Sequence, residues 1–209
     1  MVDLATLTQV IEVGDRTAAV SLARDAVAAG LPPQAILDAM TSAMQVVGGR
    51  FQRNEIYVPE MLIAARAMKE AMAALEPVLV GAGIHPEATA ILGTVKGDLH
   101  DIGKNLVGMM WKGANIEVID LGTNVPAERF VQAAKDHNAR IVGISALLTT
   151  TMVGMRDVVE AVRGAGVGNV KVIVGGAPVT ADFAREIGAD AYAADAGAAV
   201  EVVQAALLS

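Results

Sequence analysis

The chain changes its hydrophobic period near residue 88, and this change restricts the folds that it can form. From there on, short β-rich runs alternate with helix-like segments up to the end of the sequence. The expected strands cover residues 89–95, 116–120, 140–145, 170–174 and, more weakly, 189–193. Alternation of this kind predicts a parallel sheet with helices on both faces. We therefore expect residues 88–209 to form a five-stranded, flavodoxin-like or Rossmann-like α/β domain, in which ligands bind beyond the carboxyl ends of the strands.

The first 84 residues show a helical period instead. Along the last segment of this region apolar residues recur at three- and four-residue steps, and Pro59 suits the first turn of a helix there. The residues of this stripe are Val58, Met61, Leu62, Ala65, Met68, Met72 and Leu75. Segments 3–13, 15–29 and 33–49 have similar patterns. Four short helices predict a bundle, so we expect a helical domain over residues 1–84, with residues 80–86 as the linker.

The composition excludes several classes of function. A net charge of −7 and an aromatic content of 3% argue against a nucleic-acid surface, which needs clustered Lys and Arg and rings for stacking. The absence of cysteine rules out thiolate chemistry, and three histidines make a multi-histidine metal site improbable. We expect no membrane span and no secretion signal, and so a soluble, cytoplasmic protein. Difficult chemistry would have to come from a bound organic cofactor.

The segment after the first expected strand, residues 96–105, combines chemically useful residues. Two glycines enclose a histidine, His100, with a carboxylate on either side. Asp98 could accept a hydrogen bond from one ring nitrogen of His100 and leave the other free to bind a metal, because such carboxylates fix the tautomer of a ligand histidine. The simpler interpretation is a surface histidine, with Asp101 capping the next helix. Spacing alone does not decide between the two.

A longer stretch around this loop carries a family resemblance. The run GTVKGDLHDIGKNLV (93–107) resembles the signature of the B12-binding modules of cobalamin-dependent methionine synthase and of the corrinoid proteins of methyltransferase systems. Its core is Asp-x-His-x-x-Gly. Companion motifs follow in the family's order, namely Ser145-Ala146-Leu147 within SALLTTTM and Gly175-Gly176 within GGAPVT. In the helical half, FQRNEIYVPE (51–60) is similar to the cap that precedes the B12 domain. The resemblance therefore covers nearly the whole chain.

The resemblance implies a role for each matching residue. In these proteins the benzimidazole tail leaves the cobalt and the motif histidine replaces it, so His100 would be the lower axial ligand in a base-off, His-on complex. Asp98 would be its hydrogen-bond partner, and the Thr151 hydroxyl would complete the relay. Further cofactor contacts would come from residues in the loops at the sheet edge. These residues are Gly97, Leu99, Asp101, Gly103, Ser145, Leu147, Thr149, Gly175, Gly176 and Ala196.

Some of these residues also have structural interpretations. By resemblance, Phe51 and Val58 would shield the upper face of the cobalt, but either could simply belong to the core of the helix bundle. Thr149 to Thr151 could be an N-cap run for the next helix, and the Gly175-Gly176 pair could mark a turn. Leu37 stands where the family has an acidic cap contact, so that contact is not carried over to this chain.

The resemblance also implies a function, that of a methyl carrier. The cofactor would be cobalamin or a related corrinoid, as methylcobalamin or hydroxocobalamin. Cobalt(I) would accept a methyl group from a donor-specific methyltransferase, and methyl-cobalt(III) would pass it to tetrahydrofolate or coenzyme M through a second methyltransferase. A reductive activation protein would be a third partner. The residues do not choose among methanol, a methylamine, a methoxylated aromatic and a betaine as the donor.

Three other functions remain open at this point. A B12-dependent isomerase subunit would share Asp-x-His-x-x-Gly but would not need the helical cap. A non-catalytic B12 sensor or storage protein would usually carry an output domain. A flavodoxin-like nucleotide-binding domain would leave His100 and the cap without a role.

Overall fold

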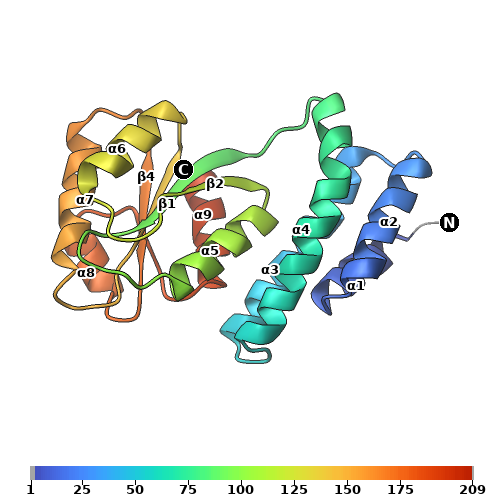
Figure 1. The fold of residues 1–209 in the computed structure, drawn as a ribbon, viewed down its shortest axis with the longest axis horizontal. Helices are drawn as coiled ribbons and strands as arrows, with labels where there is room; N and C mark the ends of the chain where they lie inside the picture. The colour runs from blue at the N-terminus through green and yellow to red at the C-terminus, as the bar shows by residue number, and fades with distance from the viewer. Residues whose placement is uncertain (1–2, 209) are drawn as a thin grey trace. The chain divides into compact units, whose positions relative to one another are not determined.

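The computed structural model describes residues 3–208, which form nine helices and five strands. The chain divides into two compact units (Figure 1). One unit consists of Met1–Pro86 with Lys112–Asn115, and the other consists of Glu87–Trp111 with Ile116–Ser209. We call them the helical unit and the α/β unit. Within residues 3–208, no helix is both long enough and apolar enough to cross a membrane.

The helical unit contains the four expected helices, α1 (Leu4–Glu12), α2 (Arg16–Ala28), α3 (Pro33–Gln52) and α4 (Val58–Gly81). The carboxylates of Asp3 and Asp15 cap α1 and α2 by accepting hydrogen bonds from main-chain N–H groups. The last two helices are longer than the sequence predicted. Helix α3 continues past the predicted residue 49 to Gln52, and α4 reaches Gly81. Most helical stability in proteins comes from tertiary packing, which can extend a helix beyond its local signals. The predicted linker therefore starts too early, since its first two residues, Val80 and Gly81, belong to α4.

The core of the helical unit is made almost entirely of Ala, Met, Leu and Ile side chains. The predicted stripe on α4 is partly wrong, because Leu62 is 37% exposed while Ala64 and Ala71 are buried. The helix contacts both α2 and α3, so its buried surface is wider than one narrow stripe. The turn between α1 and α2 approaches α4 so closely that a Cβ on Gly14 would lie 2.0 Å from the Ile63 side chain. Glycine is needed there both for space and for its positive φ of 77°.

The α/β unit is built on the predicted five-stranded parallel sheet. Its strands are β1 (Ala88–Thr94), β2 (Ile116–Asp120), β3 (Ile141–Ser145), β4 (Lys171–Gly175) and β5 (Ala191–Ala193). They follow the order β2-β1-β3-β4-β5, and all neighbouring pairs are parallel. The sheet confirms the flavodoxin-like prediction, and β2 has the predicted boundaries. The interior strands are buried on both faces, which accounts for their continuous apolar sequences.

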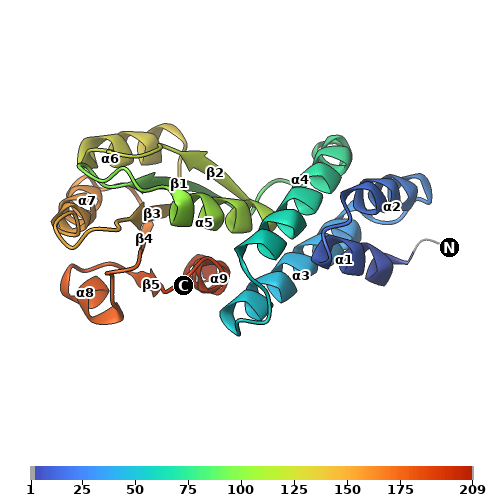
Figure 2. The ribbon, with the colours of Figure 1, turned by 60° about the horizontal axis from the view of Figure 1, so that its bottom comes forward.

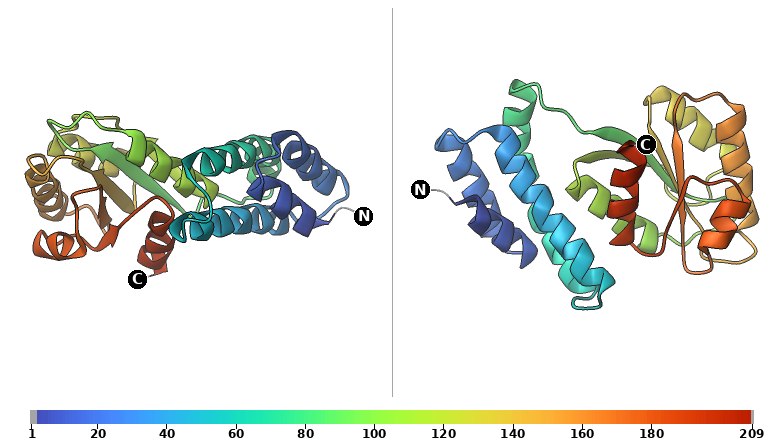
Figure 3. Two further views of the ribbon diagram at one scale, coloured as in Figure 1. Left: turned by 90° about the horizontal axis from the view of Figure 1, so that it is seen from below. Right: turned by 180° about the vertical axis from the view of Figure 1, so that it is seen from behind.

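Helices cover both faces of this sheet. Figure 2 shows α6 (Ala127–Asp136), α7 (Val153–Gly164) and α8 (Ala181–Glu186) on one side and α5 (Ile102–Gly113) and α9 (Ala198–Leu208) on the other. The two panels of Figure 3 show the same layers from below and from behind. Phe130 and Met155 fill the first layer, and on the other side Trp111 Nε1 donates a hydrogen bond to the Ala199 carbonyl at 2.8 Å.

The strand order places a topological switch point between β1 and β3. The connection from β1 leads outward to β2, and the connection from β2 returns across β1 to β3. The loops that follow β1 and β3 consequently leave the sheet in opposite directions at neighbouring positions. Ligands of open α/β sheets bind at such a point, beyond the carboxyl ends of the strands.

Candidate functional site

Asp98 joins the two loops at the switch point. It lies in the loop between β1 and α5, and its side chain is fully buried. Its Oδ2 atom accepts hydrogen bonds from Leu147 N–H at 2.8 Å and from the Thr151 hydroxyl at 2.7 Å, both in the loop after β3. Leu148 N–H lies 3.3 Å from the same oxygen. One buried carboxylate thus binds two loops that are about fifty residues apart in the chain.

The other carboxylate oxygen of Asp98 orients His100. Asp98 Oδ1 accepts a hydrogen bond from His100 N–H at 3.0 Å and lies 2.7 Å from His100 Nδ1. This is the hydrogen bond that the sequence led us to expect. Because an ionised carboxylate can only accept, the proton of the neutral ring resides on Nδ1, and Nε2 keeps a free lone pair. The His100 side chain is 50% exposed, so it is open to a ligand.

The electrostatics of the site keep Asp98 ionised. Burial by itself would raise the pKa of the Asp98 carboxyl. The hydrogen bonds that this carboxyl accepts, led by the one from Leu147 N–H, outweigh burial and hold its pKa well below the ordinary value of 3.8. A permanent negative charge therefore lies against the imidazole of His100. Such a carboxylate fixes the tautomer and the orientation of a histidine that binds a metal.

Thr151 is held by the same carboxylate and does not cap the helix that follows. Its Oγ1 lies 2.7 Å from Asp98 Oδ2 and 2.9 Å from the Leu148 carbonyl oxygen. Helix α7 begins at Val153, and its N-cap residue is Met152, which makes no side-chain capping bond. The alternative interpretation of Thr149 to Thr151 as an N-cap run is therefore wrong.

Thr94, at the end of β1, is a buried anchor of the histidine loop that the sequence analysis missed. Its side chain has no exposed surface, and its hydroxyl donates a hydrogen bond to the His100 carbonyl oxygen at 2.9 Å. Buried hydroxyls need a partner, and here the partner is the main chain of the loop. The available signal was a hydroxyl residue at the end of an otherwise apolar strand.

Three of the glycines predicted to contact the cofactor are also required by the conformation of the protein chain. Gly97 has a φ of +83°, a conformation that residues with a Cβ rarely adopt. A Cβ on Gly176 would lie 1.9 Å from the Ala146 carbonyl oxygen, and one on Gly175 would lie 2.9 Å from that of Ala193. The pair therefore allows close main-chain contact at the end of β4. By contrast, a Cβ on Gly103 would meet nothing within 4 Å.

The other residues predicted for the α/β unit lie at the same edge of the sheet. Ser145 ends β3 half-buried, and Thr149 is exposed in the loop after it. Asp101 directly precedes α5, where its carboxylate accepts a hydrogen bond from Asn105 Nδ2 at 3.1 Å. Ala196 is buried just before α9. All of these positions follow the carboxyl ends of strands, as the sequence analysis expected.

The two loops that Asp98 joins carry a group of exposed apolar side chains. Large hydrophobic side chains stand in solvent in the loops after β1 and β3 and in the first turns of the helices that follow. They are Leu99, Ile102, Leu147, Leu148 and Val153, with exposed fractions from 41% to 76%. Exposed apolar residues in a group mark a surface that a ligand or partner covers. The apolar surface and the single imidazole together suit a large, partly apolar ligand that carries a metal.

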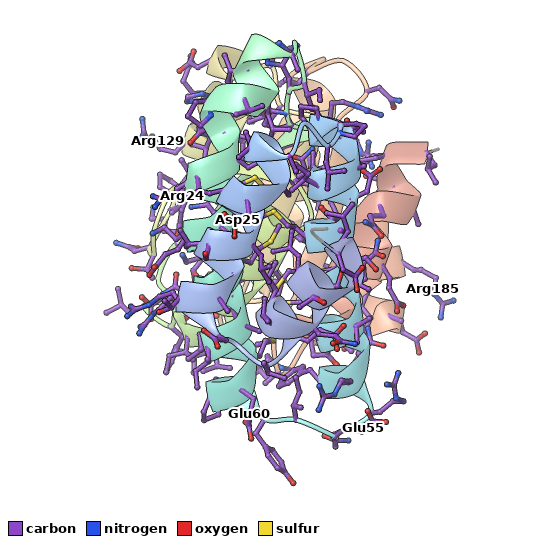
Figure 4. The ribbon with its side chains drawn as sticks, turned by 90° about the vertical axis from the view of Figure 1, so that its right-hand side faces the viewer. Arg24, Asp25, Glu55, Glu60, Arg129 and Arg185 are labelled. Atoms are coloured by element: carbon purple, nitrogen blue, oxygen red, sulfur yellow. The ribbon has the colours of Figure 1, made fainter. Side chains whose placement is uncertain are left out.

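Phe51 and Val58 lie on either side of the turn between α3 and α4 in the helical unit. Both are half-buried, and Ile56 between them is buried. Glu55 and Glu60, labelled at the lower end of the unit in Figure 4, brace this turn. Glu55 pairs with Arg53 at 2.7 Å, and Glu60 accepts a hydrogen bond from Tyr57 N–H at 3.1 Å.

Comparison with known proteins assigns a family to both units. Residues 88–203 match the model of a B12 binding domain, and residues 4–76 match a second model of the same description. The chain is 40% identical over 198 residues to trimethylamine corrinoid protein 1 of Methanosarcina mazei, covering 93% of this chain and 92% of that one.

Solved structures agree with this assignment. A crystal structure of a cobalamin-binding protein from Desulfitobacterium hafniense aligns with a TM-score of 0.84 and 32% identity over 99% of both chains. The methanol:cobalamin methyltransferase complex MtaBC of Methanosarcina barkeri aligns with a TM-score of 0.84 and 27% identity, over 97% of this chain and 78% of that one. The chain thus belongs to the family of B12-binding corrinoid proteins, and its cofactor is cobalamin or a related corrinoid.

Proposed function

We propose that this protein carries methyl groups on a corrinoid whose cobalt would be held by His100 through Nε2. The observation that carries the proposal is the state of this imidazole, with Nδ1 on a buried, ionised carboxylate and the side chain half exposed. When bound, the corrinoid supplies a cobalt centre that takes up and releases a methyl group. The protein supplies a ligand, a proton relay and a shaped surface.

The residues at the sheet edge fit such a cofactor. His100 Nε2 would be the protein's ligand to the cobalt of such a cofactor. The exposed apolar side chains of the two loops suit the underside of a large macrocycle. We assign cofactor contacts to Leu99 and Leu147 on this surface, and to the other residues that the family resemblance points to at this edge.

The Asp98, His100 and Thr151 side chains would work as one unit. Asp98 holds the proton of His100 on Nδ1 and so keeps Nε2 free for the metal. The distance of 2.7 Å between Asp98 Oδ1 and His100 Nδ1 fixes the orientation of the ring. Thr151, hydrogen-bonded to the other carboxylate oxygen, helps to keep Asp98 ionised.

We assign residues 1–84 to a helical cap and residues 88–209 to the corrinoid-binding domain. Phe51 and Val58 would shield the upper face of the cofactor, because a dry apolar lid excludes water from a reactive metal centre. Methyl transfer requires access to the same face. The cap would therefore have to move aside when a partner enzyme docks.

We infer that the partners are two methyltransferases and a reductive activation protein. The relatives support the first of these partners, since one is named for trimethylamine and another was solved in a methanol:cobalamin methyltransferase complex. The donor would then be a methylamine, methanol or a similar methylated compound. The acceptor would be tetrahydrofolate or coenzyme M, loaded by the second enzyme.

The test is electron paramagnetic resonance of the cobalt(II) form after loading the full chain with hydroxocobalamin and reducing it. The wild-type spectrum should show splitting from one histidine nitrogen, and His100→Ala should lose that splitting while keeping some corrinoid. His137→Ala is the matched control, because His137 is exposed at the end of α6, away from the carboxyl edge of the sheet. Histidine splitting retained in His100→Ala would refute the assignment.

A further inference from the structure

The loop between β2 and α6, residues 121–126, holds the histidine loop through Asn124. The Asn124 side-chain oxygen accepts a hydrogen bond from Gly97 N–H at 2.8 Å. The main-chain N–H of Asn124 donates to the Asp98 carbonyl oxygen at 2.9 Å. One residue thus binds two consecutive residues of the histidine loop, directly before His100.

The conformation of both partners shows why an asparagine suits this position. Asn124 has a φ of +56° and Gly97 has a φ of +83°, so both lie in the left-handed region. Asparagine enters this region more readily than most residues, and its side-chain amide supplies the acceptor that Gly97 N–H needs. Asn124 itself is exposed. A hydrogen bond there adds little to the free energy of unfolding but can fix a local geometry.

The β2–α6 loop is in turn fixed firmly to the sheet. Thr94 exchanges two main-chain hydrogen bonds with it, accepting from Val125 N–H at 2.9 Å and donating to the Gly122 carbonyl oxygen at 3.0 Å. The ammonium group of Lys104, in the first turn of α5, is almost fully buried against the Asp120 carboxylate at 2.6 Å. A cation in the first turn of a helix opposes the helix dipole, so the ion pair has to compensate. The loop that carries Asn124 is therefore held rigidly against the sheet.

We propose that Asn124 is a positioning residue for His100. The loop after β3 fixes the Asp98 carboxylate, and Asn124 fixes the main chain that carries this carboxylate. Together they hold the His100 imidazole in one orientation. Without Asn124, the segment from Gly97 to Asp98 can rotate, and the Asp98 carboxylate no longer holds the Nδ1 proton of the ring in one geometry. That the orientation of the His100 ring matters for binding cobalt rests on the proposed function.

The structure offers well-matched variants. Asn124→Gly removes the acceptor and permits the same positive φ, whereas Asn124→Asp keeps an acceptor oxygen. Asn138→Gly is the control, because Asn138 is also exposed with a positive φ of 47°, but it lies in the turn before β3, at the amino edge of the sheet. All three variants should retain the wild-type circular dichroism spectrum.

The first measurement uses the full chain without cofactor and reads the nitrogen chemical shifts of the His100 ring by NMR. In Asn124→Gly the ratio of the Nδ1-protonated to the Nε2-protonated tautomer should fall about threefold to tenfold, as expected for the loss of one ordinary hydrogen bond. The Gly97 amide should exchange with solvent faster by a similar factor. Asn124→Asp should restore both values, and Asn138→Gly should change neither. A wild-type tautomer ratio in Asn124→Gly overturns the proposal.

The second measurement loads each variant with hydroxocobalamin and compares the share of the histidine-bound cobalt(II) form by electron paramagnetic resonance. Asn124→Gly should lower the ratio of bound to unbound histidine by about threefold to tenfold. If the wild type shows His100-dependent splitting and Asn124→Gly has the same ratio as the wild type, the role of Asn124 toward cobalt is overturned. Absence of histidine splitting in the wild type instead contradicts the proposed function, and the tautomer ratio then still decides whether Asn124 positions the ring.

Discussion

Each of the two units has an apolar core, but the α/β unit also contains a buried polar network. Within residues 3–208, the buried polar and charged side chains are Thr94, Asp98 and Lys104, and all three belong to the histidine loop or its borders. The core of the helical unit consists of apolar side chains, many of them Ala and Met. Apolar packing depends on volume and tolerates exchange, whereas a buried polar network depends on direction and does not. We therefore expect the site to be rigid and the helical unit to be adaptable.

The largest expected effect is that of Asp98→Ala. This change leaves Leu147 N–H and the His100 ring without their acceptor, while the Thr151 hydroxyl keeps the Leu148 carbonyl oxygen. We expect a loss of about 3 kcal/mol in the free energy of unfolding. Denaturation followed by the fluorescence of Trp111, the only tryptophan of the chain, measures the α/β unit. Asp101→Ala is the control and should change stability by less than about 0.5 kcal/mol, because Asp101 is exposed. Equal losses in the two variants would show that the network around Asp98 is not special.

The Asp98 carboxylate should also make the stability of the α/β unit depend on pH in the acid range. The pKa of Asp98 is lower in the folded protein than its ordinary value of 3.8, so its contribution to stability is complete above that value. The contribution is lost as the pH falls below about 3.8 toward the folded pKa, because the unfolded chain then binds a proton that the folded one does not. Stability of the cofactor-free protein should fall more steeply below pH 4 than that of Asp98→Asn. Parallel pH profiles would contradict the direction of this pKa shift.

Thr151→Val should have an intermediate effect. The valine keeps the shape of the side chain but removes one of the donors to the ionised Asp98, for an expected loss of about 1.5 kcal/mol. Thr151→Ser retains the hydroxyl and should stay within about 0.5 kcal/mol of the wild type. Urea denaturation of the cofactor-free protein compares the two variants. A serine variant as unstable as the valine variant would assign the effect to the lost methyl group rather than to the hydrogen bond.

The smallest effect is expected in the helical unit, for Met68→Leu. Met68 is buried in α4, and leucine has nearly the same volume, so the loss in stability should be below about 1 kcal/mol. Helix content followed by circular dichroism during thermal unfolding measures the change. A loss as large as that of Asp98→Ala would mean that the helical core is as sensitive to substitution as the polar network.

Much of the fold could be predicted from the sequence, because the relevant signals are local. The change of period at residue 88 and the buried strands followed from short-range patterns, and β2 was placed at its observed boundaries. The ends of α3 and α4 could not be predicted, since packing extends these helices beyond their local signals. Leu62 was misassigned for a similar reason, because α4 packs against more than one helix, mainly α2 and α3.

The candidate site divides in the same way. Asp98 and His100 are two residues apart, so their hydrogen bond could be foreseen from spacing. Thr94 and Asn124 were missed, because neither belongs to the Asp-x-His-x-x-Gly core. Asn124 also reaches the loop from a segment 27 residues away in the chain. The Gly175-Gly176 pair was noticed, but its close contacts with the Ala146 and Ala193 carbonyl oxygens became visible only in three dimensions.

The amino-acid sequence by itself determined the order of helices and strands, the parallel sheet and the pairing of a histidine with a nearby carboxylate, since these depend on neighbours in the chain. Only the tertiary structure decided which groups bury and ionise Asp98 and which residues fix the loop from either side. The donors from Leu147 and Thr151 lie in the loop after β3, far along the chain from Asp98. Their hydrogen bonds form only after β1 and β3 have paired in register.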